Sequence, residues 1–572
     1  MQFLMKREKI KKHKITTSEL RDCWSLIRPW WVSEEKWVAR GLFLLVFALD
    51  LSIVRIGAWL ANWNESFFNA FQNYNLDDVW KLLFEALLIA LTGITVEASR
   101  TWFYQTLQMK WRKWVTDVYL DGWMKGRVFH RIESNHEIDN ADQRISEDLK
   151  QMVELSLHLS LGFFANLFKL VTFSIIIWNI SGTLSFAIWG VQVNIPGYML
   201  WVSIVYALIA SIFMEKRGRE MVSVEYEQQQ RESDFRFMMM RIRENSSEIA
   251  ISNGEESEKS ALKRYFSRIE NNWDFIKRYT KRITVIEKGY TEFGILLAYL
   301  MIIPRYFAHQ IQLGSIMKLT MSFTNVRVGF AWFVFQYKRL TSLRSMCRRL
   351  AELYVCMNAD YDTSIDFTSN DEDCIKVDNL EIALSDGTLI TKVDHLKIIP
   401  GSRWLIKGHS GAGKTTFLKA ISGIWQYGSG TISLPQKNLM FLPQVSYLPI
   451  GNLKTALCYP NPSEQFDNED CIKVLKECRL EQYVDSLELD DLSWSKKLSP
   501  GEKQRLAFAR CILLKPDYLF LDEATSAMDP ELEGHVFKVL TDRLKDTAII
   551  SVAHRESMNV YHDNVLNILG QK

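Results

Sequence analysis

Gly408-His409-Ser410-Gly411-Ala412-Gly413-Lys414-Thr415-Thr416 is the stretch that decides how the rest of this 572-residue chain is interpreted. It fits the pattern Gly-x-x-x-x-Gly-Lys-Thr, with an apolar run at 404–407 before it and a helix-forming run at 417–420 after it. This order of strand, loop and helix favours a phosphate-binding loop over a glycine-rich surface turn. In such a loop, backbone N–H groups and a helix N-terminus surround the phosphates, Lys414 reaches the β- and γ-phosphates, and Thr415 ligates Mg²⁺. The predicted phosphate-binding residues are Gly408, Ser410, Gly411, Gly413, Lys414, Thr415 and Thr416.

The composition indicates a membrane half followed by a soluble half. Charged residues make up 24% of the chain, yet hydrophobic residues make up 48%, and most of the 19 tryptophans precede residue 350. The formal charge of +2 is nearly neutral, so we expect no nucleic-acid partner. The eight cysteines form no Cys-x-x-Cys pair and no ligand-like spacing with histidine, which predicts reduced thiols rather than a zinc site or a disulfide framework.

Six membrane spans are predicted, each close to the ~20 residues that cross the hydrocarbon core. They lie near Ala39–Leu60, Leu83–Trp102, Leu155–Trp178, Gly197–Met214, Gly289–Phe307 and Ile316–Phe335. Lysines and arginines are clustered in the N-terminal segment and absent from 56–80, present again at 110–113, absent from 170–215, and present at 216–219. By the positive-inside rule, this alternation predicts cytoplasmic termini, a cytoplasmic soluble domain and a multi-pass membrane protein. Buried helices of a large soluble protein are the alternative, but they do not explain the alternating charge.

The sequence predicts four parts of the chain. Residues 1–38 form a cytoplasmic tail and an interfacial elbow helix, in which Trp24, Trp30, Trp31 and Trp37 can anchor at the headgroup level. Residues 39–340 form the membrane domain, whose long charged stretches between spans predict helices that continue well into the cytosol. Residues 341–373 form an acidic linker, and residues 374–572 form an α/β phosphate-loop domain.

Charged residues within the predicted spans have two interpretations. Asp50 and Arg55 lie in the first span, and charges at that depth either face a wet cavity on a substrate path or form a structural pair inside the bundle. Both interpretations also apply to Glu97, Lys169, Glu292, Lys318 and Arg327.

The soluble domain contains further motifs in a fixed order after the phosphate loop. Gln444 follows a strand and is placed to sense Mg²⁺ and the attacking water. The buried strand 518–521 is followed by Asp522, a predicted Mg²⁺ ligand with Thr415 and Gln444, and by Glu523, the predicted general base.

Leu498-Ser499-Pro500-Gly501-Glu502-Lys503-Gln504-Arg505 resembles the signature motif of ABC ATPases. Ser499 as N-cap, Pro500 at the first helical position and Glu502 at the third predict a capping box that starts a helix over Gly501–Leu513. Ser526-Ala527-Met528-Asp529 resembles the D-loop, and His554, after the strand Ala548–Val552, resembles the switch histidine that contacts the γ-phosphate. With Glu523 and Gln444, His554 completes the predicted catalytic residues.

Together these motifs resemble the ABC transporter superfamily over the whole chain. The resemblance implies an exporter-type, domain-swapped bundle of six long helices followed by an ABC ATPase domain that uses ATP and Mg²⁺. It also implies that each ATP lies between the phosphate loop of one subunit and the signature of the other, contacted by Ser499, Gly501 and Asp529. Because the chain holds one copy of each motif, we expect a homodimer.

Finer stretches resemble one branch, the bacterial half-transporters related to SbmA/BacA peptide importers and the eukaryotic D subfamily of peroxisomal acyl-CoA and lysosomal cobalamin transporters. They are found at 140–145, 195–198, 247–256, 304–307 and 423–430. The likeness implies that Asn140–Asp148 and Glu248–Glu256 lie at or near the cytoplasmic couplers. One departure is that Val377–Thr391 lacks the aromatic residue that usually stacks on adenine, with Leu384 or Ser385 in its place. This predicts weak discrimination between ATP and GTP.

ATP-driven transport is the favoured function. The resemblance implies a bulky hydrophilic solute, cobalamin or a peptide, that moves inward across the inner (plasma) membrane of a bacterium. The alternatives are a transporter of acyl-CoA or lipid-type substrates and a membrane-anchored ATPase that acts as a sensor or scaffold. A further alternative is a transporter that also uses a proton gradient, for which intramembrane acids such as Asp50 and Glu292 would be candidates.

Overall fold

The computed structural model describes residues 19–135, 138, 140–188, 191–359, 364–489, 494–553 and 555–570. The chain forms two compact units, Met1–Asn358 and Ala359–Lys572, which we call the helical unit and the α/β unit. The boundaries predicted at residues 38, 340 and 373 stay predictions.

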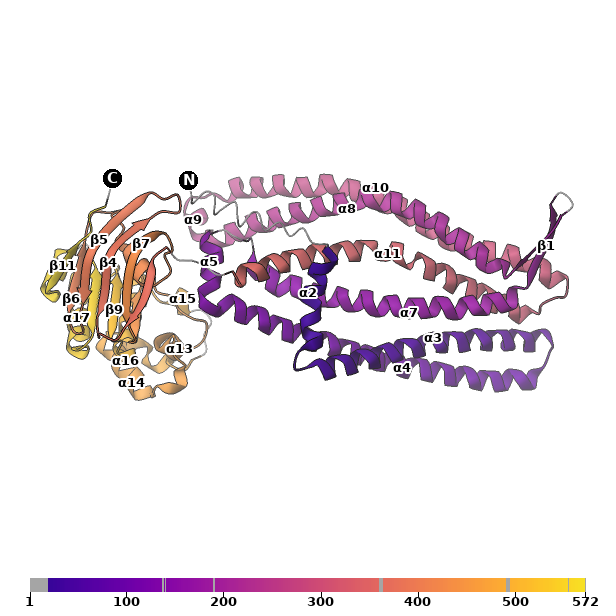
Figure 1. Ribbon diagram of the computed structural model, residues 1–572, viewed down its shortest axis with the longest axis horizontal. Helices are drawn as coiled ribbons and strands as arrows, with labels where there is room; N and C mark the ends of the chain where they lie inside the picture. Colours follow the sequence, from indigo (N-terminus) through magenta and orange to yellow (C-terminus); the bar gives the residue numbers. More distant parts are fainter. Residues whose placement is uncertain are drawn as a thin grey trace. The chain divides into compact units, whose positions relative to one another are not determined.

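Long helices build the helical unit (Figure 1). They are α2 (Glu19–Val32), α3 (Lys36–Gln72), α4 (Leu76–Met124), α7 (Leu149–Ser181), α8 (Tyr198–Glu244), α10 (Glu255–Phe307) and α11 (Leu313–Met357). Shorter elements connect them: η1 (Lys125–Arg127), α5 (Val128–Asn135), α6 (Ala141–Gln143), η2 (Arg144–Asp148) and α9 (Ser246–Ile251). Helix α3 packs against α4, α7 against α11, and α8 against α10, while α11 also contacts α3 and α8.

The long helices exceed the predicted spans, as expected from the charged stretches between them. Helices α4, α8 and α10 have 49, 47 and 53 residues, far more than the ~20 that cross a bilayer. Among the described residues, three stretches are both long and apolar enough to cross a membrane: Lys36–Gln72, Leu76–Asn135 and Ala141–Ser181. The number of six spans therefore stays a prediction.

A β-hairpin between α7 and α8 was not predicted from the sequence. Strands β1 (Thr183–Ile188) and β2 (Val191–Pro196) pair antiparallel, and Figure 1 shows them at the opposite end of the helical unit from α5 and α9. Gly197 adopts a positive φ of 62°, and a Cβ atom there would lie 2.3 Å from a ring carbon of Trp178. Glycine therefore permits the close return of the hairpin to α8.

Two charged residues of the predicted spans are paired between helices. Asp50 of α3 is 6% exposed and accepts a hydrogen bond of 2.8 Å from Nε of Arg100 on α4. Lys318 of α11 donates to Glu65 of α3 over 2.7 Å. These contacts favour the structural interpretation for Asp50 and Lys318, because each charge has a partner of opposite sign.

Arg327 is the most deeply buried of these charged residues, with 1% of its surface exposed. Its Nη1 donates to the backbone carbonyl of Tyr290 on α10 over 2.7 Å, and its guanidinium lies 4.5 Å from the centre of the Tyr290 ring. Tyr206 of α8 stacks on Tyr290, with ring centres 4.9 Å apart. Arg327 thus holds α8, α10 and α11 together through hydrogen bonding and a cation–π contact.

The elbow helix α2 packs into the helical unit through Trp30. Trp30 is fully buried and stacks on Trp111 of α4, with ring centres 5.4 Å apart. The prediction that Trp30 anchors at the headgroup level is therefore wrong, whereas Trp24 and Trp37 are exposed as that role requires. Burying the indole ring of Trp30 against another ring is energetically favourable, and the sequence does not show that such a ring is nearby.

Two sheets form the α/β unit. The first contains five parallel strands in the order β11-β6-β10-β9-β8, and the second contains β3-β7-β4-β5. The strands are β3 (Asp366–Asn370), β4 (Ile375–Ala383), β5 (Leu389–Ile398), β6 (Arg403–Lys407), β7 (Gly428–Pro435), β8 (Leu439–Leu442), β9 (Tyr518–Asp522), β10 (Ala548–Val552) and β11 (Asn564–Asn567). The helices that the site uses are α12 (Lys414–Ile421), α16 (Pro500–Leu514) and α17 (Pro530–Arg543).

The central parallel strands β9 and β10 are buried on both faces, which fits their nearly continuous apolar sequences. Leu519 and Leu521 point into a cluster with α16 and α17, whereas Phe520 points into a second cluster with α12 and the other sheet. The two cores fix the strands in register and so fix the positions of the residues that follow each strand.

Candidate active site

The predicted catalytic residues follow neighbouring parallel strands at the same edge of the sheet. In the register, Val552 at the end of β10 lies opposite both Asp522 of β9 and Ile406 of β6. Leu442 at the end of β8 lies opposite Leu521 of β9. The phosphate loop, Asp522, Glu523 and Gln444 therefore gather at one edge, where open α/β sheets commonly bind ligands. His554 follows β10 but lies outside the described residues, so its predicted role stays a prediction.

The phosphate loop needs its glycines for close packing as well as for backbone geometry. Gly413 has a φ of 91°, and a Cβ atom there would lie 2.6 Å from Ile390. A Cβ atom on Gly408 would lie 2.6 Å from the carbonyl oxygen of Ile568. Helix α12 begins directly after the loop and is held by buried Phe417, so its N-terminal N–H groups open onto the loop.

Lys414 closes over the loop. Its Nζ donates to the carbonyl oxygens of Gly408 and His409 over 2.8 and 3.0 Å, and the residue is 6% exposed. An ammonium held by two carbonyl oxygens at the mouth of a glycine loop fits a phosphate group, which would offer it a stronger, charged acceptor.

A hydroxyl and two carboxylates lie beside the loop. Thr415 donates from Oγ1 to Oδ1 of Asp522 over 3.1 Å, and Gln444 donates from Nε2 to Oε2 of Glu523 over 3.2 Å. Burial raises the pKa of Asp522, the hydrogen bond from Thr415 opposes this rise, and the charge of Glu523 adds to it. A cation at this position would lower that pKa again.

These oxygen donors fit Mg²⁺, which prefers hard oxygen ligands and commonly keeps phosphate oxygens and water in its shell. Among the described residues, no group of three His, Cys, Asp or Glu side chains could hold a metal ion by itself. The Thr415 and Asp522 oxygens therefore suit an ion that arrives with a nucleotide. When bound, Mg²⁺ would neutralise charge on the phosphates.

Glu523 is held at the edge by its backbone. It adopts a φ of 49°, an unusual left-handed conformation for a residue other than glycine. Its N–H donates to the carbonyl of Val552 over 3.0 Å, and its own carbonyl accepts from the N–H of Ser526. This conformation turns the side chain out of the strand direction at the sheet edge, where it can accept a proton from water.

The signature stretch forms the predicted capping box. Glu502 donates from its N–H to Oγ of Ser499 over 3.3 Å, and Oε2 of Glu502 accepts from the N–H of Ser499 over 2.8 Å. Tyr483 also donates to Glu502, over 2.9 Å. Helix α16 therefore starts at Pro500, the predicted first helical position, and Ser499 is exposed at its N-terminus. An exposed helix N-terminus is suited to an anion.

Gln504 joins the signature helix to the D-loop, a contact that the sequence did not reveal. Its Nε2 donates to Oγ of Ser526 over 3.2 Å, and its Oε1 accepts from the N–H of Ala527 over 2.9 Å. A Cβ atom on Gly501 would lie 3.0 Å from the carbonyl oxygen of Ala527. Asp529 caps α17 by accepting from the N–H of Leu532 over 2.9 Å. The sequence offered one hint of this contact: Gln504 lies one turn into α16, on a side that is buried.

Arg555 is a second residue that sequence reasoning missed. It donates to the carbonyl of Met528 over 2.9 Å and pairs with buried Glu533 over 3.3 Å. Thr525 also donates to Glu533, over 2.6 Å. The D-loop is thus fixed on one side by Gln504 and on the other by the residue that follows His554.

The predicted site residues form two separate groups in this chain. Lys414, Thr415, Asp522 and Glu523 lie at the sheet edge, whereas Ser499 lies at the start of α16. Among the described residues, no hydrogen bond or ion pair joins Ser499 to the phosphate loop. Each group alone supplies only one side of a phosphate-binding site.

Leu384, one of the two residues at the position predicted to face the adenine base, is exposed directly after β4. Trp425, which precedes β7, donates from its indole N–H to the carbonyl of Ala383 over 3.0 Å and packs against the core. Because the Trp425 ring packs against the core, it does not replace the missing aromatic contact with the adenine base. Weak discrimination between ATP and GTP stays a prediction.

Comparisons with known proteins match both units. The model of the ABC transporter transmembrane region 2 matches residues 26–307, and the ABC transporter model matches residues 392–526. The inner membrane ABC transporter ATP-binding protein YddA of Escherichia coli is 31% identical over 548 residues, covering 95% of this chain and 96% of that protein. The human lysosomal cobalamin transporter ABCD4 is 25% identical over 585 residues, covering 95% and 93%. A bacterial Atm1-family ABC exporter with ATP bound has the same fold, with a TM-score of 0.73 and 16% identity over 94% of each chain.

Proposed function

The chain belongs to the ABC transporter family, whose members hydrolyse ATP to drive transport, and on that premise we propose that two copies of it form a homodimeric half-transporter. The dimer would carry a bulky hydrophilic solute, cobalamin or a peptide, inward across a bacterial inner membrane. Likeness to an inner membrane protein and to a cobalamin transporter supports the membrane and the solute class.

The separation of the two groups of site residues carries the proposal. Ser499 and Asp529 are exposed at the surface, and a rigid set of hydrogen bonds through Gln504 holds this surface in shape. No hydrogen bond or ion pair among the described residues joins Ser499 to the phosphate loop, where Lys414 bonds to the Gly408 carbonyl and Thr415 to Asp522. A second copy, arranged with two-fold symmetry, would place each signature surface on the other copy's phosphate loop and complete two equivalent ATP sites.

Within each completed site, this chain's residues would act in sequence. Lys414 and the loop N–H groups would bind the β- and γ-phosphates, and the partner's signature helix N-terminus would face the γ-phosphate from the other side. Gln444 would orient the attacking water, and Glu523 would accept its proton. Closing and opening of the α/β units would move the helical units, with the stretches around Asn140–Asp148 and Glu248–Glu256 at or near the couplers.

Subunit complementation tests the shared site. Lys414→Ala removes the phosphate-loop cation, and Ser499→Arg blocks the signature surface, so homodimers of either variant should lack ATPase activity. Dimers that contain one copy of each keep one intact loop facing one intact signature. Random co-assembly should restore about a quarter of wild-type activity, since half of the dimers carry one of two sites.

Two controls keep the result interpretable. Ser499→Arg should still bind a fluorescent ATP analogue at its own phosphate loop, and Lys414→Ala should melt at the wild-type temperature. Co-expressed Lys414→Ala and Lys414→Met chains should show no recovery, because neither has an intact loop. Absence of recovery in the Lys414→Ala and Ser499→Arg mixture would contradict a site shared between copies.

A further inference from the structure

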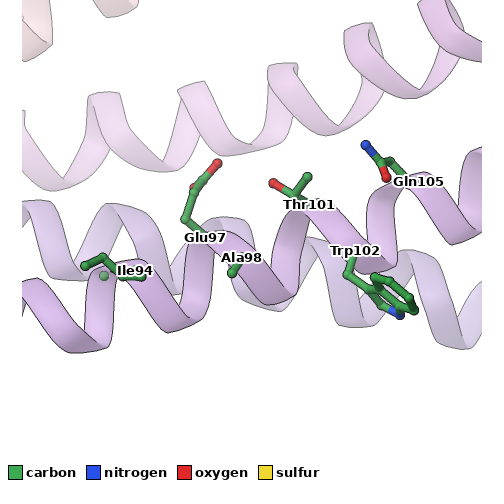
Figure 2. Close-up of a pocket in the computed structure, with 7 residues that line it drawn as sticks. Ile94, Glu97, Ala98, Thr101, Trp102 and Gln105 are labelled. Carbon is green, nitrogen blue, oxygen red and sulfur yellow. The ribbon is translucent and has the colours of Figure 1, made fainter.

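Helix α4 presents two chemically different exposed faces. Phe84, Leu91 and Trp102 are exposed on one face, and Leu91 is 53% exposed. Another face carries a polar residue at every fourth position, namely Glu97, Thr101 and Gln105. The side chain of Glu97 is 56% exposed. Figure 2 shows Glu97, Thr101 and Gln105 projecting from the same side of α4, while Trp102 projects from a different side.

The two faces need different surroundings. Glu97 and Thr101 lie within the predicted span Leu83–Trp102, which belongs to one of the stretches apolar enough to cross a membrane. An exposed carboxylate at that depth is costly against lipid and instead faces water or a protein partner, whereas exposed Leu91 suits the lipid. The remaining side of α4, with Leu107 fully buried, packs within the helical unit.

Glu97 belongs to a group with surplus negative charge. Arg100 is paired with Asp50 through Nε at 2.8 Å, and its Nη1 lies 3.8 Å from Oε1 of Glu97. Arg100 also lies over the ring of Tyr104, 5.4 Å from the ring centre. Among the described residues, no second cation is paired with either acid. Two carboxylates therefore share one guanidinium, and the exposed carboxylate is that of Glu97.

An open pocket of about 630 Å³ lies along this part of α4 and has a mixed lining, in which Glu97, Thr101 and Gln105 alternate with the apolar residues Gly93, Ile94, Ala98 and Trp102. A carboxylate, a hydroxyl and an amide along one helix stripe offer hydrogen-bond acceptors to a hydrophilic solute. We infer that this polar face of α4 lines the path of the transported solute and binds a positively charged group of it, an ammonium or a guanidinium. The inference rests on the proposed transport function.

Thiol labelling tests the inference without knowledge of the solute. Thr101→Cys and the matched lipid-facing control Leu91→Cys are made in the full chain and placed in lipid nanodiscs. Seven of the eight native cysteines are buried, so a Cys356→Ser background leaves little competing reaction. The probes are two water-soluble methanethiosulfonates, one bearing a trimethylammonium group and one bearing a sulfonate.

Thr101→Cys should react with both reagents at least about tenfold faster than Leu91→Cys, because only the polar face meets water. After normalisation to free cysteine, the cationic reagent should be preferred about tenfold at Thr101→Cys, because Glu97 lies one turn away. Glu97→Gln should reduce that preference to about threefold or less. Glu85→Gln is the control, because it neutralises an acid three turns away from Glu97 that accepts a hydrogen bond from Trp59. This variant should leave the preference for the cationic reagent unchanged.

Three outcomes would overturn the inference. One is equal reactivity of Thr101→Cys and Leu91→Cys, and another is a charge preference that survives Glu97→Gln. The third is a disulfide between two Thr101→Cys copies with no labelling, which would show that this face packs against a second copy. Labelling requires neither ATP nor solute flux, so a failure of the proposed transport function would be detected separately, by flux measurements on the wild type.

Discussion

Asp522 and Glu523 of the α/β unit end a strand at an open sheet edge, whereas Arg327 of the helical unit is buried among three helices. Asp522 accepts a hydrogen bond of 3.1 Å from Thr415, and Glu523 accepts one of 3.2 Å from Gln444. Arg327 is enclosed by a carbonyl and an aromatic ring. The difference teaches that a charge left partly exposed, as at Asp522 and Glu523, can act on a ligand, whereas a charge enclosed by helices, as at Arg327, holds those helices together.

Replacing Glu523 should have the largest effect, and this effect should be on the rate of ATP hydrolysis and not on ATP binding. Glu523→Gln keeps the shape of the side chain but removes the proton acceptor, so ATP hydrolysis should fall at least about 100-fold while ATP binding is retained. The variant should also accumulate as an ATP-bound closed dimer, seen by cross-linking or size analysis. A turnover close to that of the wild type would remove Glu523 from the mechanism and weaken the contrast between the two units.

Arg327 should show the opposite pattern, a loss of stability without a loss of nucleotide binding. Arg327→Ala removes a fully buried side chain and leaves a cavity between α8, α10 and α11, which should cost about 2–4 kcal/mol of stability. Thermal melting of the detergent-solubilised protein measures the loss, and binding of a fluorescent ATP analogue should not change.

Arg348→Ala is the matched control on the same helix. Arg348 is largely exposed and pairs with Glu352 one turn away, so its loss should cost about 0.5 kcal/mol or less. If Arg327→Ala melted like Arg348→Ala but altered solute flux, Arg327 would belong to the transport path and the contrast would fail.

The smallest expected effect is on nucleotide preference, at the position of the α/β unit that is predicted to face the nucleotide base. Stacking on an aromatic ring contributes about 1–3 kcal/mol per base, so without such a platform the base should be held weakly, and we expect ATP to be preferred over GTP by less than about tenfold. Leu384→Tyr should lower the KM for ATP about tenfold, and Ser385→Ala should leave it unchanged. Steady-state hydrolysis with both nucleotides gives the ratio, and a large ATP preference in the wild type would show that another group grips the base.

The parts that the sequence predicts well are those fixed by local chemistry. The capping box at Ser499 needs only three residues within one turn, and the gathering of Asp522 with the phosphate loop follows from parallel strands that end at one edge. Parallel strands also read as continuous apolar runs, so their positions were visible in advance.

The parts that the sequence does not predict depend on which helix faces which. Asp50 finds its partner in Arg100, 50 residues away, and Gln504 bonds to the D-loop 23 residues away. Trp30 looked like a headgroup anchor because its sequence neighbourhood is amphipathic, but Trp111 on another helix offers a stacking surface. Such pairs are set by tertiary packing, which local periodicity does not specify.

ATP-driven solute movement by reconstituted protein tests the central claim most directly. Proteoliposomes with the α/β unit outside are preloaded with labelled cobalamin or with an arginine-containing peptide, and ATP is added outside. Because inward transport in the cell corresponds to release from these vesicles, we predict ATP-dependent release of one of the two solutes by the wild type and none by Glu523→Gln. ATP hydrolysis by the wild type with no release of either solute, or equal release by Glu523→Gln, would contradict the account.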